Sequence, residues 1–220
     1  MDSYSVLALD LVKAFGETFR MVGISLLCSI VFGIPLGLFL FTTDKGLFYE
    51  NKILNLVGGF VVNIIRSVPF VILLVLLLPF TQWIIGSTIG PTAASVPLSV
   101  AAVAFYARLV ESSLREIDFG VIEAAHAMGA SPFQIVRHVL VAESLPGILR
   151  GLTVTAISLI GYSAMAGIVG GGGVGDLAIR FGYYRYQTNV MMSTVVALIV
   201  FVQLVQMFGD YLARKANKEG

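Results

Sequence analysis

The sequence predicts an all-α integral membrane protein with about five transmembrane helices and one cytoplasmic loop. Only 12% of its 220 residues are charged, against about 25% in soluble domains. Hydrophobic residues make up 57%, which leaves too little polar surface to cover a water-soluble globule. This composition excludes a soluble enzyme. The formal net charge of +1 excludes a nucleic-acid binder driven by net charge, and a single cysteine, Cys28, excludes a disulfide scaffold.

Long stretches without charge locate the membrane spans. They run for 23 to 41 residues and lie at 21–43, 67–107, 151–175 and 186–209. A helix needs about 20 apolar residues to cross the hydrocarbon core, so the 41-residue stretch holds two crossings, divided at Gly86, Gly90 and Pro91. The alternation of apolar and polar residues expected of membrane β-barrel strands is missing from the sequence. We therefore predict helices at 21–42, 58–80, 92–109, 151–170 and 190–209.

The distribution of basic residues predicts the orientation of these helices. Five crossings place the two termini on opposite sides, and cytoplasmic loops carry the excess of Lys and Arg. With a cytoplasmic C-terminus, the inside group holds nine basic residues: Lys45, Lys52, Arg108, Arg115, Arg137, Arg150, Arg214, Lys215 and Lys218. The outside group then holds four: Lys13, Arg20, Arg180 and Arg185. We therefore expect the N-terminus outside and the C-terminus in the cytoplasm.

The chain has no internal repeat, so we expect one transmembrane domain over 1–220 with a structured cytoplasmic loop at about 110–150. Residues 108–150 hold nine of the 27 charges and both histidines. Their pattern predicts a first helix at 121–128 that ends at Gly129, followed by a second helix with Ser131 as N-cap, Pro132 at N1 and Gln134 at N3. Small residues around Ala124, Ala125 and Gly129 would let a partner approach closely.

One segment of this loop, Glu123-Ala124-Ala125-His126-Ala127-Met128-Gly129, resembles the EAA motif in the permease subunits of bacterial ABC importers. Val141-Ala142 stands where that family usually has Leu-Pro, and a Leu-Pro pair follows at Leu145-Pro146. Without the motif, Glu123 would be read as a solvated carboxylate. The resemblance implies instead that Glu123, Ala124, Ala125 and Gly129 belong to a coupling helix that contacts a cytoplasmic ATPase.

The resemblance continues through most of the chain. The segments Asn63–Phe70, Val96–Leu98 and Tyr106–Glu111 are similar to the amino-acid-import branch, and Gly161–Met165, Gly170–Gly173 and Gly182–Tyr184 resemble the permease of methionine importers in particular. A type I importer permease fold is implied, with alternating access for methionine (L- and/or D-) across the bacterial inner membrane. The implied partners are two ATPase subunits, a second copy of the chain, an extracytoplasmic binding protein and membrane lipid.

The chain itself is not expected to be an enzyme. No lysine follows a glycine anywhere in the sequence, so the phosphate-binding Walker A motif is missing. We therefore expect no cofactor in this chain, with ATP and Mg bound by the separate ATPase. Gly170, Gly172 and Gly175 match a dinucleotide fingerprint only by spacing, and we interpret them as an outer turn that lets a docking protein or a helix come close.

A polar stripe on the fourth helix is a candidate lining of the translocation path. Thr155, Ser158, Tyr162 and Met165 follow one another at helical spacing. Such hydroxyls in a membrane helix face protein or a cavity, so helix–helix hydrogen bonding is an equal alternative. Because the stripe carries no charge, it should hold a zwitterionic solute weakly, and selection would then happen on another protein.

Two further sets of residues have more than one interpretation. On the second helix, Asn63, Arg66 and Ser67 form a polar face. One interpretation is that Arg66 orients a substrate carboxylate. The other is that its side chain reaches the nearby inner membrane interface or pairs with a residue within the bundle. Four methionines would form a thioether site or, more commonly, fill core space: Met165, Met191, Met192 and Met207.

Alternative functions remain at this point. The permease could serve another polar amino acid or a related small solute. A secondary transporter is a different class, but no Asp or Glu falls within the five predicted spans to bind a coupling ion. An intramembrane serine protease would need a base near Ser163, and both histidines, His126 and His138, lie in the cytoplasmic loop.

Overall fold

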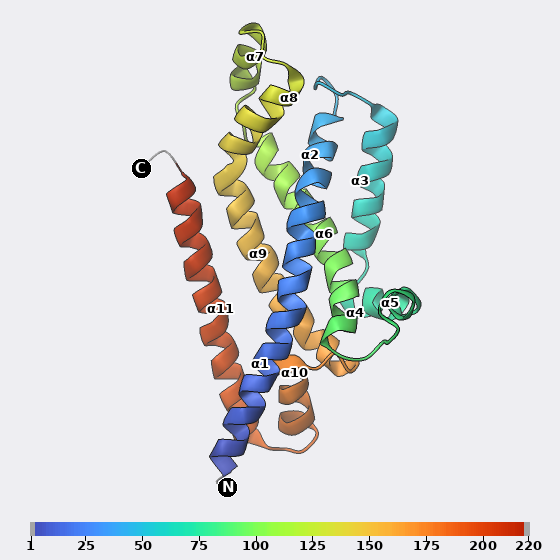
Figure 1. Cartoon of the computed structure of the whole chain (residues 1–220), viewed down its shortest axis with the longest axis vertical. Coiled ribbons are helices and arrows are strands. Elements are labelled where there is room, and N and C mark those ends of the chain that lie inside the picture. Colours follow the sequence, from blue (N-terminus) through green and yellow to red (C-terminus); the bar gives the residue numbers. More distant parts are fainter. Residues whose placement is uncertain (1–2, 218–220) are drawn as a thin grey trace.

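The computed structural model describes residues 3–217, and this part of the chain consists of helices joined by short turns, with no strand (Figure 1). Four helices are long and apolar enough to cross a membrane, and one bent pair of helices makes a fifth span. The prediction of five crossings is therefore confirmed when the bent pair is taken as one span. Of the basic residues that predict the orientation, Lys218 lies outside the described residues.

The first span is one continuous helix made of α1 (Ser3–Cys28), the π-helical η1 (Ser29–Gly33) and α2 (Ile34–Thr42). The π-helical turn comes directly before Pro35, which cannot donate a backbone hydrogen bond and would clash in a regular α-helix. The candidate span, Leu9–Thr42, has 34 residues and is about 51 Å long, well beyond a hydrocarbon core of about 30 Å. The predicted start at residue 21 is therefore wrong, because the helix continues out of the membrane into its charged N-terminal part.

The second span differs from the continuous helix predicted at 58–80. Here α3 (Lys52–Ser67) is bent by 106° against α4 (Phe70–Leu76), and α5 (Leu78–Ile85) follows. Pro69 is the cause, since the residue before a proline is driven out of the α region, and Val68 is extended at φ −82°, ψ 127°. The helix therefore stops inside the apolar stretch.

The third and fourth spans extend beyond their predicted cytoplasmic ends. α6 runs over Pro91–Arg115 instead of ending at residue 109. The fourth span begins at residue 132 instead of 151, because α8 (Pro132–Ile135), the π-helical η2 (Val136–Leu140) and α9 (Val141–Ile168) form one helix of 37 residues. The predicted loop at 110–150 is thus reduced to residues 116–131, which contain α7 (Phe119–Ala127).

The turn after α9 is rich in glycine, and these glycines let neighbouring helices pack closely, as the sequence predicts. Gly170, Gly172 and Gly173 have positive φ angles, which glycine adopts without strain. They lead into α10 (Gly173–Leu177) and the π-helical η3 (Ala178–Tyr183), and α11 (Thr188–Ala216) is the last span. A Cβ atom on Gly175 would overlap the backbone of Ala164, so this glycine lets α10 lie directly against α9.

The buried core is organised around α6. Its residues Leu98, Ala102, Tyr106, Val110 and Leu114 repeat every four positions and are almost fully buried. The Tyr106 hydroxyl donates to the backbone oxygen of Ile148 at 3.1 Å, which joins α6 to α9. Figure 1 shows α7 and α8 together at one end of this bundle, with α1 beginning at the opposite end.

Candidate coupling loop and translocation site

The short helix α7 is fixed at both ends by the capping residues that the sequence predicts. Asp118 caps its start by accepting from the Gly120 backbone N–H at 2.7 Å, and Gly129 ends it with φ +82°. Ser131 and Gln134 form a complete capping box at the start of α8. The observed bounds, Phe119–Ala127, differ from the predicted 121–128 by no more than two residues.

The two sides of α7 differ in exposure. Ile122 and Ala125 are buried against a core cluster that includes Ile135. The opposite side exposes four residues: Glu123, Ala124, Ala127 and Met128. Gly129 is exposed as well, so the small-residue face of the sequence prediction is present, except that Ala125 faces the protein interior. The exposed alanines would let a partner surface come close to the helix backbone.

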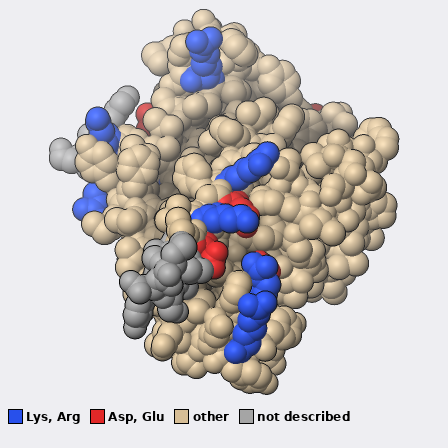
Figure 2. Space-filling model, turned by 60° about the horizontal axis from the view of Figure 1, so that its bottom comes forward, with Lys and Arg blue, Asp and Glu red and all other residues tan. Residues whose placement is uncertain are grey.

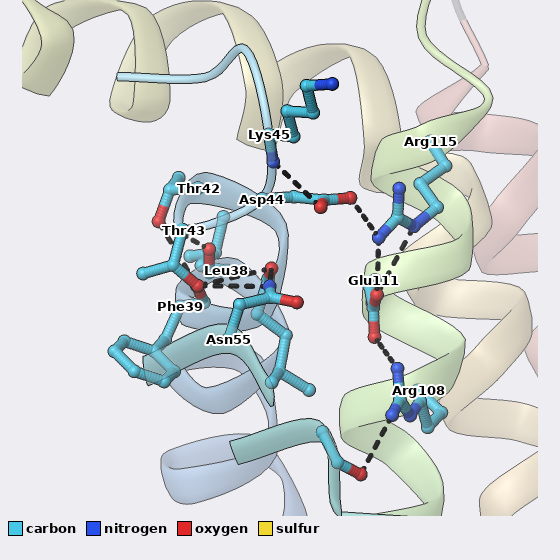
Figure 3. A network of polar contacts seen from close by, with 12 residues as sticks. Leu38, Phe39, Thr42, Thr43, Asp44, Lys45, Asn55, Arg108, Glu111 and Arg115 are labelled. Carbon is cyan, nitrogen blue, oxygen red and sulfur yellow. Dashed lines mark hydrogen bonds and ion pairs between the residues drawn. The ribbon is translucent and has the colours of Figure 1, made fainter. Parts of the chain in front are cut away.

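An ion-pair network centred on a buried carboxylate lies beneath this loop (Figure 3). Glu111, only 5% exposed, accepts from Arg108 at 2.6 Å and from Arg115 at 2.9 Å. Arg115 also pairs with Asp44 at 2.7 Å. Because α6 extends to residue 115, Glu111 belongs to this long helix, two residues beyond the end predicted at residue 109.

The network joins three helices at this end of the bundle. Arg108 donates from Nη2 to the backbone oxygen of Gly59 at 3.0 Å and to Oδ1 of Asn63 at 3.1 Å, both on α3. Asn55, near the start of α3, donates to the backbone oxygen of Leu40 at 2.6 Å. These contacts hold α2, α3 and α6 together next to the coupling loop.

We predict that the Asp44 contact weakens only in acid. The Lys45 backbone N–H, at 2.8 Å, and then the Arg115 guanidinium lower the pKa of the Asp44 carboxyl from its ordinary value of 3.8. Because the folded-state pKa is the lower one, the stabilisation is fully present above about pH 3.8 and is lost as the pH falls through the folded-state pKa. Asp44→Asn should therefore lower the unfolding temperature at neutral pH, and the difference from wild type should shrink below pH 3.8. A difference that stays constant down to pH 3 would contradict this.

The candidate polar stripe of the fourth helix is only partly on one surface. Thr155 is buried, and its hydroxyl donates to the Gly151 backbone oxygen at 2.8 Å within its own helix. Ser158 is half-buried, and Met165 is 42% exposed. Tyr162 stacks on Phe70 with ring centroids 4.7 Å apart.

Arg66 and Tyr162 line one cavity of 170 Å³ between α3, α4, α6 and α9. Arg66 is at the end of α3 that is farthest from the loop with Lys45 and Lys52. Because the helix starts six residues earlier than predicted and stops at Ser67, Arg66 lies near the far end of α3 and not near its start. Asn63 pairs with Arg108, not with Arg66.

The fold agrees with what comparison with known proteins finds. A family model described as "Binding-protein-dependent transport system inner membrane component" matches residues 11–218. The chain belongs to this family. That membership removes the secondary transporter as an alternative. The protease alternative fails on geometry as well, since the Ser163 hydroxyl is buried and donates to the Ile160 backbone oxygen at 2.7 Å.

Curated relatives of this family member carry related names. It is 51% identical over 207 residues to the probable D-methionine transport system permease protein MetI of Vibrio cholerae, covering 94% of this chain and 92% of that protein. It is 46% identical over 179 residues to the methionine import system permease protein MetP of Bacillus subtilis, covering 81% of each chain.

Two solved structures give the same fold. A chain from inward-facing conformations of the MetNI methionine ABC transporter aligns with a TM-score of 0.95 and 44% identity, covering 99% of this chain and all of the other. A chain from an amino acid ABC transporter with histidines aligns at 0.72 with 19% identity, covering 95% and 98%, which is a likeness of fold alone.

The methionines of this transport-system component are not core filler. Met165, Met191, Met192 and Met207 are 36–66% exposed within the described chain. Met165 lies on α9, and the other three lie on α11.

The end of the molecule where α1 begins carries a polar cavity of 270 Å³. Five charged residues line it: Asp10, Lys13, Glu17, Asp176 and Arg180. Glu17 accepts from the Gly173 backbone N–H at 2.8 Å and so holds the glycine turn against α1. Figure 2 shows this end, where acidic and basic side chains lie side by side near the centre of the view, with further basic side chains toward its edges. The sequence analysis did not identify this cluster, because its members come from two segments more than 150 residues apart in the chain.

Proposed function

We propose that this chain is the transmembrane subunit of an ATP-driven importer that moves methionine across the inner membrane by alternating access. The observation that carries the proposal is α7, a capped helix that exposes Glu123, Ala124 and Ala127 at the end of the bundle. The 44% identity to a MetNI methionine ABC transporter chain, over nearly all of both chains, supports the substrate.

The connections of α7 explain how an ATPase would drive the membrane helices. On one side α7 follows α6 after three residues, and on the other side it leads within a few residues into the continuous helix Pro132–Ile168. Its inner side is fixed to the bundle through Ile122 and Ala125. A displacement of α7 would therefore pass directly to the two central spans. Such a transporter works only if the ATPase binds the two conformations of the permease with different free energies.

The partners and orientation follow from this role. Two ATPase subunits would bind two copies of α7 in a dimer of this chain, and an extracytoplasmic binding protein would deliver substrate. ATP and Mg would be bound by the ATPase, since no lysine follows a glycine in this chain and the Walker A motif is therefore missing. We place α7 and the C-terminus in the cytoplasm and the N-terminus outside, in keeping with the basic residues near α7.

Co-purification tests the proposal. When the chain is co-expressed with its ATPase and solubilised, we expect the ATPase to stay bound to wild type and to be largely released by Glu123→Ala. Glu116→Ala is the matched control, because Glu116 is also an exposed carboxylate but lies before α7. Retention of the ATPase by Glu123→Ala, or equal release by the control, would contradict the docking role of α7.

A further inference from the structure

We propose that Arg66 binds the carboxylate of the transported amino acid, in the cavity that it shares with Phe70 and Tyr162. This inference rests on the proposed transport function and adds a site to it. The chemical class of ligand is an α-amino acid with an apolar side chain.

The position of Arg66 in the membrane is the first argument. It lies 14 residues after Lys52, the first residue of α3, which is about 21 Å along the helix. The hydrocarbon core is about 30 Å thick, so the guanidinium is well inside the membrane when Lys52 marks its surface. Arg66 is exposed in the single chain and borders the cavity. An arginine at such a depth is expected to face a cavity, a partner or the bundle interior, which makes it a candidate functional residue.

The second argument is that Arg66 has no protein partner among residues 3–217. Arg108, the other arginine within this part of the bundle, is bonded to Glu111, Asn63 and the Gly59 backbone. Arg66 makes no ion pair and no side-chain hydrogen bond with the described residues, and no carboxylate lines its cavity. Its charge and its planar set of donors are therefore available for a carboxylate, which a guanidinium binds through two parallel hydrogen bonds.

The other walls of the cavity suit the rest of such a ligand. Phe70, Phe105 and Tyr162 contribute three aromatic rings, and the rings of Phe70 and Tyr162 are nearly parallel. Aromatic faces accept an apolar side chain and attract an ammonium group. One cation and three rings in 170 Å³ therefore select a small zwitterion with an apolar side chain over an anion with two charges.

The break at Val68-Pro69 creates this arrangement. It ends α3 at Ser67, one residue after Arg66, and turns the chain by 106°, so that Phe70 on α4 lies against Tyr162 on α9. Tyr162 belongs to the same continuous helix as the residues that follow the coupling loop. A displacement of this helix would move Tyr162 relative to Arg66 and so change the affinity of the site between the two conformations.

Thiol labelling tests the site without requiring transport. In the permease–ATPase complex, Cys28→Ala removes the native thiol and Ala101→Cys places a new one in the cavity wall. Anionic and cationic methanethiosulfonate reagents then report the local charge. We expect methionine to slow labelling and methioninamide, which has no carboxylate, to protect far less. Adding Arg66→Gln should abolish protection. It should also lower the anionic-to-cationic rate ratio by about tenfold or more, because the positive charge beside the thiol is removed.

The controls separate this site from folding and from the transport function. Arg20→Gln removes an exposed arginine outside the cavity and should change neither result, and Arg66→Lys should retain part of the protection. Equal unfolding temperatures exclude misfolding of Arg66→Gln. Undiminished protection by methionine in Arg66→Gln, or equal protection by methioninamide in wild type, would overturn the proposal while ATPase-dependent uptake of methionine still stands. Loss of that uptake in wild type would instead overturn the transport function.

Discussion

Replacing Glu111 with leucine is expected to destabilise the folded protein by about 3–5 kcal/mol, because it leaves the Arg108 guanidinium, whose side chain is only 23% exposed, without a charged partner. Glu111 is the only carboxylate that contacts both Arg108 and Arg115 among the described residues. Its loss would leave Arg108 bonded only to neutral oxygens, on Gly59 and Asn63. The measurement is the unfolding temperature of the purified protein, which should fall by about 6–20 °C at about 2–4 °C per kcal/mol.

The matched control is Glu116→Leu, on an exposed glutamate one residue beyond the end of the same helix. Exposed substitutions of this kind change stability by about 0.5 kcal/mol or less. Equal unfolding temperatures for the two variants would mean that the buried network contributes nothing to holding α2, α3 and α6 together.

Replacing Ala124 with tryptophan is expected to reduce ATP-driven uptake at least about tenfold while leaving the fold intact. Ala124 is exposed on α7 beside Glu123, so a large side chain there meets no part of the described chain. In the assembled transporter, the same side chain would hold the ATPase surface away from the helix backbone. A loss of only about 1.4 kcal/mol in docking free energy already gives a tenfold effect.

Size is the variable that this experiment isolates. Ala124→Ser keeps a small side chain and should transport like wild type, and both variants should unfold at the wild-type temperature. Normal uptake by Ala124→Trp would mean that α7 does not dock closely against its partner, and a fall in unfolding temperature would mean that Ala124 packs within the permease itself.

The sequence predicts the class of fold and the design of the coupling loop well, because both depend on local signals. Charge-free stretches identify the spans, and Ser131, Gln134 and Gly129 act through neighbouring backbone groups. Helix ends are predicted poorly, since the first charged residue marks the membrane surface and not the end of the helix. Pro69 did carry a readable signal for the break, because a proline restricts the residue before it.

The sites could be predicted only in part. The spacing of Arg108, Glu111 and Arg115 places them on one face of a helix, but their partners Asp44, Gly59 and Asn63 come from packing between helices. Nor could periodicity distinguish Thr155, satisfied within its own helix, from Tyr162, which lines a cavity. The proximity of Arg66 to Tyr162 depends on the bend between α3 and α4, which is a tertiary feature.

Uptake of labelled methionine by sealed proteoliposomes tests the central claim most directly. The vesicles hold this chain with its ATPase, ATP is supplied on the ATPase side, and the binding protein is supplied on the other side. The proposed function predicts accumulation against a gradient only when ATP, ATPase and binding protein are all present. Accumulation by the chain alone without ATP, or no ATP-dependent accumulation by the complete system, would contradict it.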